Sequence, residues 1–306
     1  MLPEDQHERL EVVLVSPRNP LNIGAAARAM ANFGFRRLTV VAPFAPHWRE
    51  ARSAVGAPEL LKDARETATL AEAVAGCTLV LGTGSLTYRK AEQAVVQLPQ
   101  LAAPVRQELG RGGRVAVVFG PEKHGLTRED LSYCHVLVEI PTDVRQPSMN
   151  LGQAVAVCLY ELAARAFAAE EGPSGAKAQG DSAGSMFGLK PGPTARRSLF
   201  PADEACEEDA AGSMRELKPM AASRGGSSAA PSGELELLAG LVEETMAAAG
   251  YSPRLMQAAN RHDLRLLLRR LAPAARDTRR MMGLFRRILW RLQHARTTGE
   301  QGGGRE

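Results

Sequence analysis

Five short aliphatic runs alternate with helical patterns along the first half of the chain, and this alternation strongly constrains the fold. The runs are residues 11–15, 38–41, 78–82, 115–119 and 136–140. Apolar residues follow one another in these runs and do not alternate regularly with polar ones, as in strands covered on both faces, and strands separated by helical segments form parallel sheets. The sequence therefore predicts an α/β domain with a mainly parallel sheet and helices on both faces, closed by a helix from Asn150 to Phe167.

The composition changes after Ala168. Residues 169–233 are rich in Gly, Ser, Pro and Ala and contain few large apolar residues, so we expect a disordered, low-complexity linker there. Helical spacing of leucines then returns. The predicted organisation is a domain at 1–168, this linker, a helical module at 234–298 and a disordered tail at 299–306.

Positive charge is concentrated in the helical module. Between Tyr251 and Arg296 there are twelve arginines and two aspartates, a net charge of +10, whereas the whole chain carries +4 and the remainder therefore −6. Phosphate contacts supply most sequence-independent affinity for nucleic acid, so RNA contact is favoured over an ordinary bundle with a solvated basic face. The arginines assigned to RNA here are Arg265, Arg269, Arg279, Arg280, Arg286 and Arg287.

Several classes of site are not expected. There is no G-x-x-x-x-G-K-[ST] phosphate loop and no H-E-x-x-H motif, and the six histidines and four cysteines lack metal-ligand spacing. The dispersed cysteines indicate a reducing cytoplasm, and neither a signal peptide nor a membrane span is expected. Gly82-Thr-Gly84 matches half of a dinucleotide fingerprint, which leaves a nicotinamide oxidoreductase as a weak alternative.

The segment Asn19-Pro-Leu-Asn-Ile-Gly-Ala-Ala-Ala-Arg28 follows the first predicted strand. We expect Asn22 to cap a helix whose small first residues allow close packing, with Arg28 one to two turns inside. Open α/β sheets bind ligands beyond the carboxyl ends of their strands, which favours a functional Arg28 near such a crevice. A surface arginine is the ordinary alternative.

Two more polar loops follow predicted strands. Residues 119–126 read Phe-Gly-Pro-Glu-Lys-His-Gly-Leu, and residues 127–130 are expected to form a capping box for a short helix. Residues 140–151 begin Ile-Pro and place Ser148 and Asn150 at the start of the closing helix. Helix capping is the ordinary interpretation of these two side chains.

In this order and spacing, the three segments resemble the three motifs of the SpoU (TrmH) branch of the SPOUT RNA methyltransferases, and most closely the TrmJ type. The resemblance covers residues 11 to about 167, and residues 235–295 resemble the helical extension of TrmJ-type enzymes. Met149 stands where many relatives have leucine, and Arg145-Gln-Pro147 departs from the pattern. The matching residues are Asn22, Gly24, Ala27 and Arg28, then Phe119, Gly120, Glu122, Gly125 and Leu126, then Ile140, Pro141, Ser148, Asn150 and Leu151.

The resemblance implies a deep trefoil knot, a homodimer and an S-adenosylmethionine pocket in the knotted loops. The residues that it assigns to the cofactor are Thr83, Gly84, Ser85, Gly120, Ile140, Ser148, Met149, Asn150 and Leu151. Those that it assigns to catalysis are Arg28, Asn22, Ser148, Asn150 and Glu122. A guanidinium stays protonated, so anchoring a phosphate or stabilising an alkoxide suits Arg28 better than proton abstraction. Bracing of the second motif is an equal alternative for Glu122.

The expected function is therefore S-adenosylmethionine-dependent 2′-O-methylation of tRNA, and the TrmJ-type resemblance indicates position 32 of the anticodon loop. Methylation of a ribosomal RNA ribose is one alternative. A catalytically inactive homologue that only binds RNA is another, and the retention of Asn22, Arg28, Glu122, Ser148 and Asn150 argues against it.

Overall fold

The sheet of the amino-terminal domain is parallel throughout. The computed structural model describes residues 4–84, 91–165, 228–251 and 256–300. In this part the strand order is β3-β2-β1-β6-β4-β7-β5, and every neighbouring pair is parallel. The strands are β1 (Leu10–Val15), β2 (Arg37–Val41), β3 (Arg65–Thr67), β4 (Leu79–Thr83), β5 (Ala94–Gln97), β6 (Val115–Phe119) and β7 (Val136–Glu139).

All five predicted strands are confirmed, as β1, β2, β4, β6 and β7, with ends within one residue of the expected ones. The predicted α/β class and parallel sheet are confirmed with them, whereas the trefoil knot stays a prediction. Strands β3 and β5 were not predicted. Both are short edge strands that are only partly buried or exposed, so neither has the continuous aliphatic run of a strand covered on both faces.

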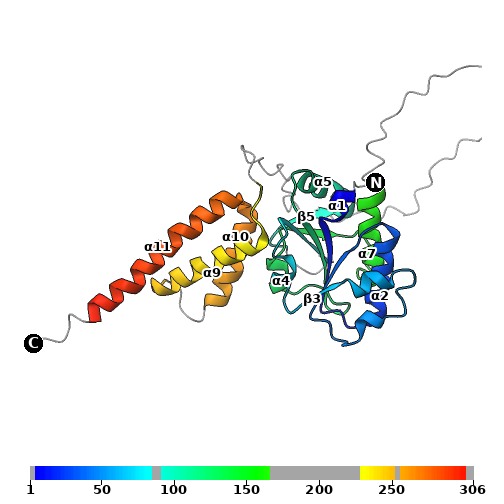
Figure 1. The fold of residues 1–306 in the computed structure, drawn as a ribbon, viewed down its shortest axis with the longest axis horizontal. Helices are drawn as coiled ribbons and strands as arrows, with labels where there is room; N and C mark the ends of the chain where they lie inside the picture. The colour runs from blue at the N-terminus through cyan, green and yellow to red at the C-terminus, as the bar shows by residue number, and fades with distance from the viewer. Residues whose placement is uncertain (1–3, 85–90, 166–227, 252–255, 301–306) are drawn as a thin grey trace, which may run out of the picture. The chain divides into compact units, whose positions relative to one another are not determined.

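Helices cover both faces of the sheet, with α2 and α7 together on one face and α4 on the other (Figure 1). The bounds are α1 (Glu4–His7), α2 (Pro20–Asn32), α3 (Pro58–Lys62), α4 (Leu70–Val74), α5 (Ala102–Gly110), α6 (Arg128–Ser132) and α7 (Leu151–Tyr160), with short 3-10 turns at Trp48–Glu50 and Leu98–Gln100. The predicted closing helix is thus α7, continued as a π-helical turn at Glu161–Arg165. Its last two predicted residues lie outside the described part.

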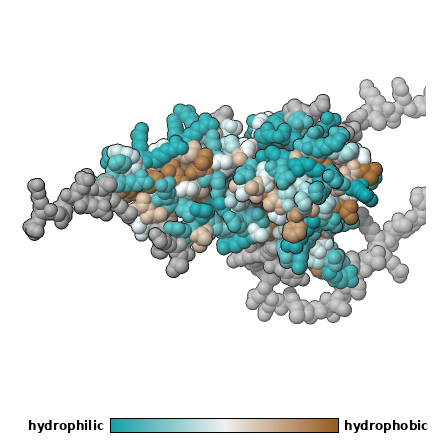
Figure 2. Space-filling view, turned by 60° about the horizontal axis from the view of Figure 1, so that its bottom comes forward, coloured by the Kyte–Doolittle hydropathy of each residue, from teal (hydrophilic) through white to brown (hydrophobic). Residues whose placement is uncertain are grey.

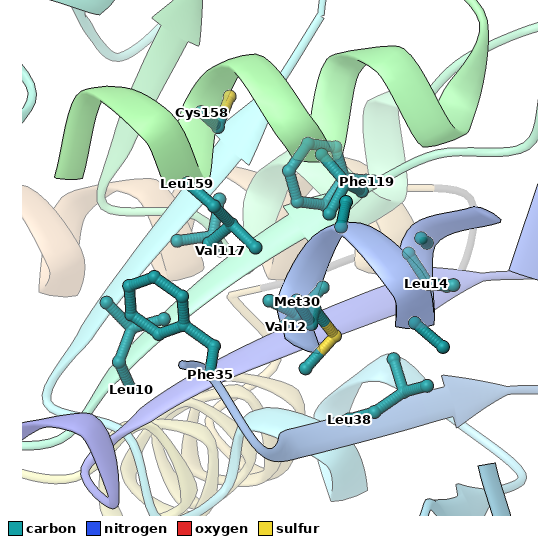
Figure 3. Close-up of a cluster of buried hydrophobic side chains, with 14 of the residues drawn as sticks. Leu10, Val12, Leu14, Met30, Phe35, Leu38, Val117, Phe119, Cys158 and Leu159 are labelled. Carbon is teal, nitrogen blue, oxygen red and sulfur yellow. The ribbon is translucent and has the colours of Figure 1, made fainter. Parts of the chain in front are cut away.

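Alternate residues of β1 enter two different cores. Val12 and Leu14 pack with α2 and α7 on one face, while Val13 and Val15 pack with α4 on the other. Figure 3 shows the first core, in which Phe119 at the end of β6 lies among these side chains. The carboxyl ends of β1 and β6 are thereby held rigidly by apolar packing, and the functional loops leave the sheet at these ends.

Three helices form the carboxy-terminal module: α9 (Ser232–Ala248), α10 (Gln257–Leu271) and α11 (Ala275–Glu300). Helix α9 packs against both α10 and α11 around a small core that includes Leu238, Leu268 and Met282. It begins two residues before the predicted start of the module at residue 234. Most of the predicted linker, residues 169–227, and the end of the predicted tail, residues 301–306, lie outside the described residues.

The module has an apolar face as well as a basic one, as its leucine and arginine spacing predicts. Hydrophobic side chains gather over it in Figure 2, and among its exposed residues are Leu237 of α9 and Leu284 and Ile288 of α11. In the described ranges, no helix combines the length and the apolar character that crossing a membrane would require.

Candidate cofactor pocket and active site

Three loops at the carboxyl edge of the sheet surround one pocket of about 310 Å³. They are the loops after β4, β6 and β7, the three strands that lie side by side as β6-β4-β7. The lining residues from these loops include Thr83, Gly84, Gly120, Pro121, Glu122, Lys123, His124, Gly125, Leu126, Ile140, Thr142, Pro147, Ser148 and Met149. The topology thus brings together segments that are separated by up to 66 residues of sequence.

Most residues that the sequence assigned to a cofactor lie around this pocket. They are Thr83, Gly84, Gly120, Ile140, Ser148, Met149 and Leu151. Asn150 is not in the lining, because its side chain turns to cap α7 and accepts a hydrogen bond from the Gly152 N–H at 2.9 Å. Ser85 lies outside the described residues. Seven of the residues predicted to bind a cofactor therefore line one pocket, whereas Asn150 lies at the start of α7 outside the lining.

Sequence reasoning missed the apolar side chains that complete the pocket. Leu131 comes from α6, Leu137 from within β7 and Ala154 from α7, and none of them belongs to a motif loop. In the sequence, each has the pattern of a core residue of its own helix or strand. These three residues line the same pocket only because of the way α6 and α7 pack on the sheet, which the sequence of each element does not show.

The second motif makes a very tight loop. A Cβ on Gly120 would lie 2.2 Å from the Leu126 nitrogen and 2.3 Å from the Gly125 carbonyl carbon. Gly125 itself has φ +64°, a left-handed conformation that favours glycine, and its N–H donates to the Pro121 carbonyl at 2.9 Å. The predicted capping box at residues 127–130 is present and starts α6 directly after this loop.

A hydrogen-bonded network joins the three motifs through Asn22, Glu122 and Asn150. The Asn22 side-chain amide donates to Glu122 Oε1 at 2.8 Å, and the Asn150 amide donates to Asn22 Oδ1 at 3.0 Å. Glu122 also accepts from the backbone N–H groups of Arg18 and Asn19, at 3.2 and 3.3 Å. The predicted bracing role of Glu122 therefore has a direct structural basis.

Comparison with known proteins agrees with this arrangement. The SpoU rRNA Methylase family matches residues 9–160. A tRNA (cytidine/uridine-2'-O-)-methyltransferase TrmJ from Klebsiella pneumoniae is 34% identical over 169 residues, which are 54% of this chain and 67% of that relative. The chain belongs to the SpoU rRNA methylase family.

Other relatives of this SpoU-family chain cover different parts of it. A tRNA (cytidine/uridine/adenosine-2'-O-)-methyltransferase TrmJ from Pseudomonas aeruginosa is 41% identical over 168 residues, 55% of this chain and 65% of the relative, so the match spans just under two thirds of that protein. The crystal structure of TrmJ from Z. mobilis has a TM-score of 0.65 at 26% identity and covers 91% of this chain and 98% of that one. A probable methyltransferase from Bordetella pertussis has a TM-score of 0.50 at 30% identity and covers 54% of this chain and 99% of that one.

In this SpoU-family domain, Asn22 does not cap α2, which corrects the sequence prediction. Helix α2 begins at Pro20, and the Asn19 side chain accepts the Leu21 N–H at 2.9 Å as the N-cap. Proline is favoured in the first turn because its missing N–H is not needed there. The shift leaves the Asn22 side chain free to bridge Glu122 and Asn150.

The electrostatic state of Glu122 follows from its contacts. Burial opposes ionisation, but the hydrogen bonds from the Asn22 side chain and from backbone N–H groups outweigh it. The pKa of the Glu122 carboxyl is therefore lowered from its ordinary value of 4.5. The network thus holds a carboxylate, which accepts bonds and donates none.

We predict an acid-sensitive contribution of Glu122 to stability. A lowered folded-state pKa means that the carboxylate stabilises the folded chain above the unfolded-state pKa and that this contribution is lost as the pH falls through the folded-state value. The gap in unfolding free energy between the wild type and Glu122→Gln should therefore be largest near neutral pH and shrink below about pH 4.5. Urea unfolding at a series of pH values measures it, and a pH-independent gap would contradict the assignment.

Arg28 lies apart from the pocket of its own chain. It is exposed on α2 and is not in the pocket lining. Helix α2 packs closely on α7, since a Cβ on Gly152 would lie 2.7 Å from the Ala25 Cβ. The fold therefore joins Asn22 to the pocket loops while Arg28 stands on the outer surface of the same helix.

Two arginines assigned to RNA are buried instead, which corrects the prediction for them. Arg265 and Arg269 have exposed fractions of 6% and 3%, and their guanidinium carbons lie 4.3 and 5.4 Å from the centroid of the Tyr133 ring. Arg265 also pairs with Glu236 at 2.6 Å. Both side chains hold α10 against α6 and α9 and are not accessible to a phosphate. Among the described residues, no group of three or more His, Cys, Asp or Glu side chains is arranged to hold a metal ion.

Proposed function

We propose that this chain is an S-adenosylmethionine-dependent 2′-O-methyltransferase of tRNA. One observation carries the proposal: the second and third motifs line one pocket together with the loop after β4, and the Asn22–Glu122–Asn150 network joins the first motif to both of them. The relatives named TrmJ supply the substrate class. A TrmJ-type activity at position 32 of the anticodon loop, in the cytoplasm, is the specific form of the proposal. Ribosomal RNA remains the alternative substrate, as the family's name indicates.

The pocket suits S-adenosylmethionine. Its volume of about 310 Å³ lies at the lower end of the range for small-molecule sites, and its walls are largely apolar with a few polar groups. Leu137, Ile140 and Met149 would form the slot for the adenine ring, and the backbone around Gly84 and Gly120 would supply hydrogen bonds at its edge. The absence of room for a Cβ at Gly120 fits a loop shaped for close backbone contact. When bound, the cofactor supplies an electrophilic methyl group on a sulfonium.

The remaining task of the protein is to orient a ribose hydroxyl toward that methyl group and to stabilise the charge that develops on the oxygen. Arg28 is suited to this task by its fixed charge, but it does not line the pocket of its own chain. We therefore propose a homodimer in which Arg28 of one copy faces the pocket of the other. Exposed apolar side chains support this arrangement, since Leu21 of α2 and Val157 and Tyr160 of α7 are 55%, 36% and 54% exposed.

Product mapping tests the proposed function. The full-length protein is incubated with labelled S-adenosylmethionine and unmodified tRNA or ribosomal RNA, and the labelled nucleotide is located by nuclease digestion and mass spectrometry. We expect a 2′-O-methylated ribose in the tRNA anticodon loop. Label in ribosomal RNA alone would favour the alternative substrate, and label in neither RNA would contradict the proposal.

The basic face of α11 is the part of the module best placed to contact RNA. Arg279 and Arg280 pair with Glu234 and Asp277, at 3.0 and 3.7 Å. Arg286 and Arg287 are exposed and have no ion-pair partner among the described residues. An arginine without an ion-pair partner can neutralise a phosphate and release a counterion from the RNA without first breaking a salt bridge. Arg286 and Arg287 should therefore contribute more to RNA affinity than Arg279 and Arg280.

We predict that the double variant Arg286→Ala/Arg287→Ala binds tRNA more weakly and with a flatter salt dependence. Loss of two phosphate contacts should reduce the slope of log K against log [salt] by about 1.5. Filter binding at several salt concentrations measures the slope. The matched control is Arg36→Ala/Arg111→Ala, which removes the same charge from exposed positions outside the module. Equal slopes for the two double variants would remove α11 from the RNA-binding surface.

A further inference from the structure

We propose that Phe44 and Arg18 form a stacking platform for an unpaired nucleobase of the RNA, beside the active site. The inference rests on the proposed function and deepens it, because it names a surface that receives the substrate. Phe44 follows β2 and is 74% exposed, one of the most exposed large apolar side chains in the described part of the chain. An aromatic ring in this position offers a free π-face to a ligand.

Arg18 completes the platform. Its guanidinium carbon lies 5.5 Å from the centroid of the Phe44 ring. Exposed aromatic rings beside arginines are the groups that bind single-stranded nucleic acid, since the ring stacks on a base and the cation attracts the backbone. A base in a duplex has no free face, so the ligand class is an unpaired nucleotide of a loop or end.

Backbone contacts hold the two side chains together. The Phe44 N–H donates to the Pro17 carbonyl at 3.2 Å, which ties the loop after β2 to the loop after β1. Both loops leave their strands through left-handed residues, Ser16 with φ 44° and Ala42 with φ 42°. The N–H of Ser16 donates to the carbonyl of Val41 in the neighbouring strand at 2.8 Å. Such costly conformations persist where surrounding contacts fix them, and they are common at functional sites.

The platform is also connected to the active-site network. The backbone N–H of Arg18 donates to Glu122 at 3.2 Å, and Glu122 accepts from Asn22 and lines the pocket. Strands β2, β1 and β6 are neighbours in the parallel sheet, so the loops that follow them lie next to one another along the carboxyl edge of the sheet. A base stacked on Phe44 is therefore held at the edge that carries the pocket, and the platform would fix the register of the RNA loop.

The test uses the full-length protein with three variants at the platform. Phe44→Ala removes the ring, Phe44→Trp keeps a stacking surface, and Arg18→Ala removes the guanidinium but keeps the backbone bond to Glu122. Val55→Ala is the control, because Val55 is also an exposed apolar residue, at 63%. The measurements are KM for unmodified tRNA, KM for S-adenosylmethionine, kcat, and oligomeric state by light scattering.

We expect Phe44→Ala to raise KM for tRNA by about tenfold or more, the scale for loss of one stacked base, with KM for S-adenosylmethionine and oligomeric state unchanged. Phe44→Trp should keep a near-normal KM, and Arg18→Ala should raise it less than Phe44→Ala. The indole fluorescence that Phe44→Trp adds to the protein should be quenched by an anticodon stem-loop and much less by a duplex RNA of equal charge.

Three results would overturn the platform: a wild-type KM for tRNA in Phe44→Ala, equal quenching by loop and duplex RNA, or dissociation of the oligomer in Phe44→Ala. The last would assign Phe44 to contact with a second copy of the chain. Failure of the proposed function is distinguishable, because it shows in the wild type as an absence of tRNA methylation before any variant is compared.

Discussion

Replacing Arg28 with alanine is expected to lower the rate of methyl transfer by about a hundredfold or more, the scale for loss of one group that stabilises transition-state charge. Binding of S-adenosylmethionine should change little, because the groups proposed to hold the cofactor belong to the pocket loops after β4, β6 and β7 and Arg28 is not among them. The rate of methyl transfer in Arg28→Lys should lie between those of the wild type and Arg28→Ala. An ammonium keeps the positive charge but loses the planar fork that binds phosphate at two points. Single-turnover transfer and calorimetric titration of the cofactor measure the two effects separately.

Arg36→Ala is a suitable control for Arg28→Ala, because Arg36 is likewise exposed and follows the same helix. A near-normal single-turnover rate in Arg28→Ala would remove Arg28 from the active site. If the rate falls, subunit mixing tells whether Arg28 acts across a dimer. For this test, Arg28→Ala is mixed in equal amounts with a variant whose pocket is defective. Half of the dimers then contain one chain of each kind, and each of these mixed dimers has one intact site, in which the intact pocket of one chain meets Arg28 of the other. About a quarter of wild-type activity should therefore be restored.

The elements that could be predicted from sequence are those with strong local signals. The core strands were identified because aliphatic runs covered on both faces are continuous, and the capping box at residues 127–130 because its chemistry is local. The start of α2 was placed too late because two asparagines compete for the cap, Asn19 and Asn22. Pro20 decides between them, since proline belongs in the first turn and makes Asn19 the cap.

The convergence of the motif loops was predictable in outline, but the pairing of their side chains was not. Glu122 is 100 residues from Asn22, and Asn150 is 128 residues from it. The sequence around Glu122 does not show whether its carboxylate acts on a substrate or, as in the structure, accepts hydrogen bonds from two backbone N–H groups and one side-chain amide. Parallel strand order and the close packing of α2 on α7 bring these residues together, and those are properties of the whole domain.

Charge counting misassigned Arg265 and Arg269 for a similar reason. A count of arginines locates a basic segment but does not separate exposed cations from those that pack on a ring. Both residues lie with Leu268 on the buried face of α10, where both guanidinium groups pack on the Tyr133 ring and Arg265 also pairs with Glu236. Their burial leaves the exposed arginines of α11, Arg286 and Arg287, as the stronger candidates for RNA contact.

Gly120→Ala is expected to abolish measurable binding of S-adenosylmethionine and to destabilise the fold by about 3 kcal/mol, the upper part of the range for overpacking. The new Cβ would meet backbone atoms of Gly125 and Leu126 at 2.3 and 2.2 Å, and backbone cannot move aside as a flexible side chain can. The loop would have to open, which would carry Glu122 away from its donors and displace one wall of the pocket.

Two further glycines separate this steric effect from a general effect of substitution. Gly125→Ala meets no atom within 4 Å but forces alanine into φ +64°, so we expect a cost of about 1 kcal/mol. Gly110→Ala in α5 meets none either and should be neutral or slightly stabilising. Denaturant unfolding should therefore rank the losses as Gly120→Ala, then Gly125→Ala, then Gly110→Ala. Cofactor affinity in Gly120→Ala equal to that in Gly110→Ala would mean that the second-motif loop does not shape the cofactor site.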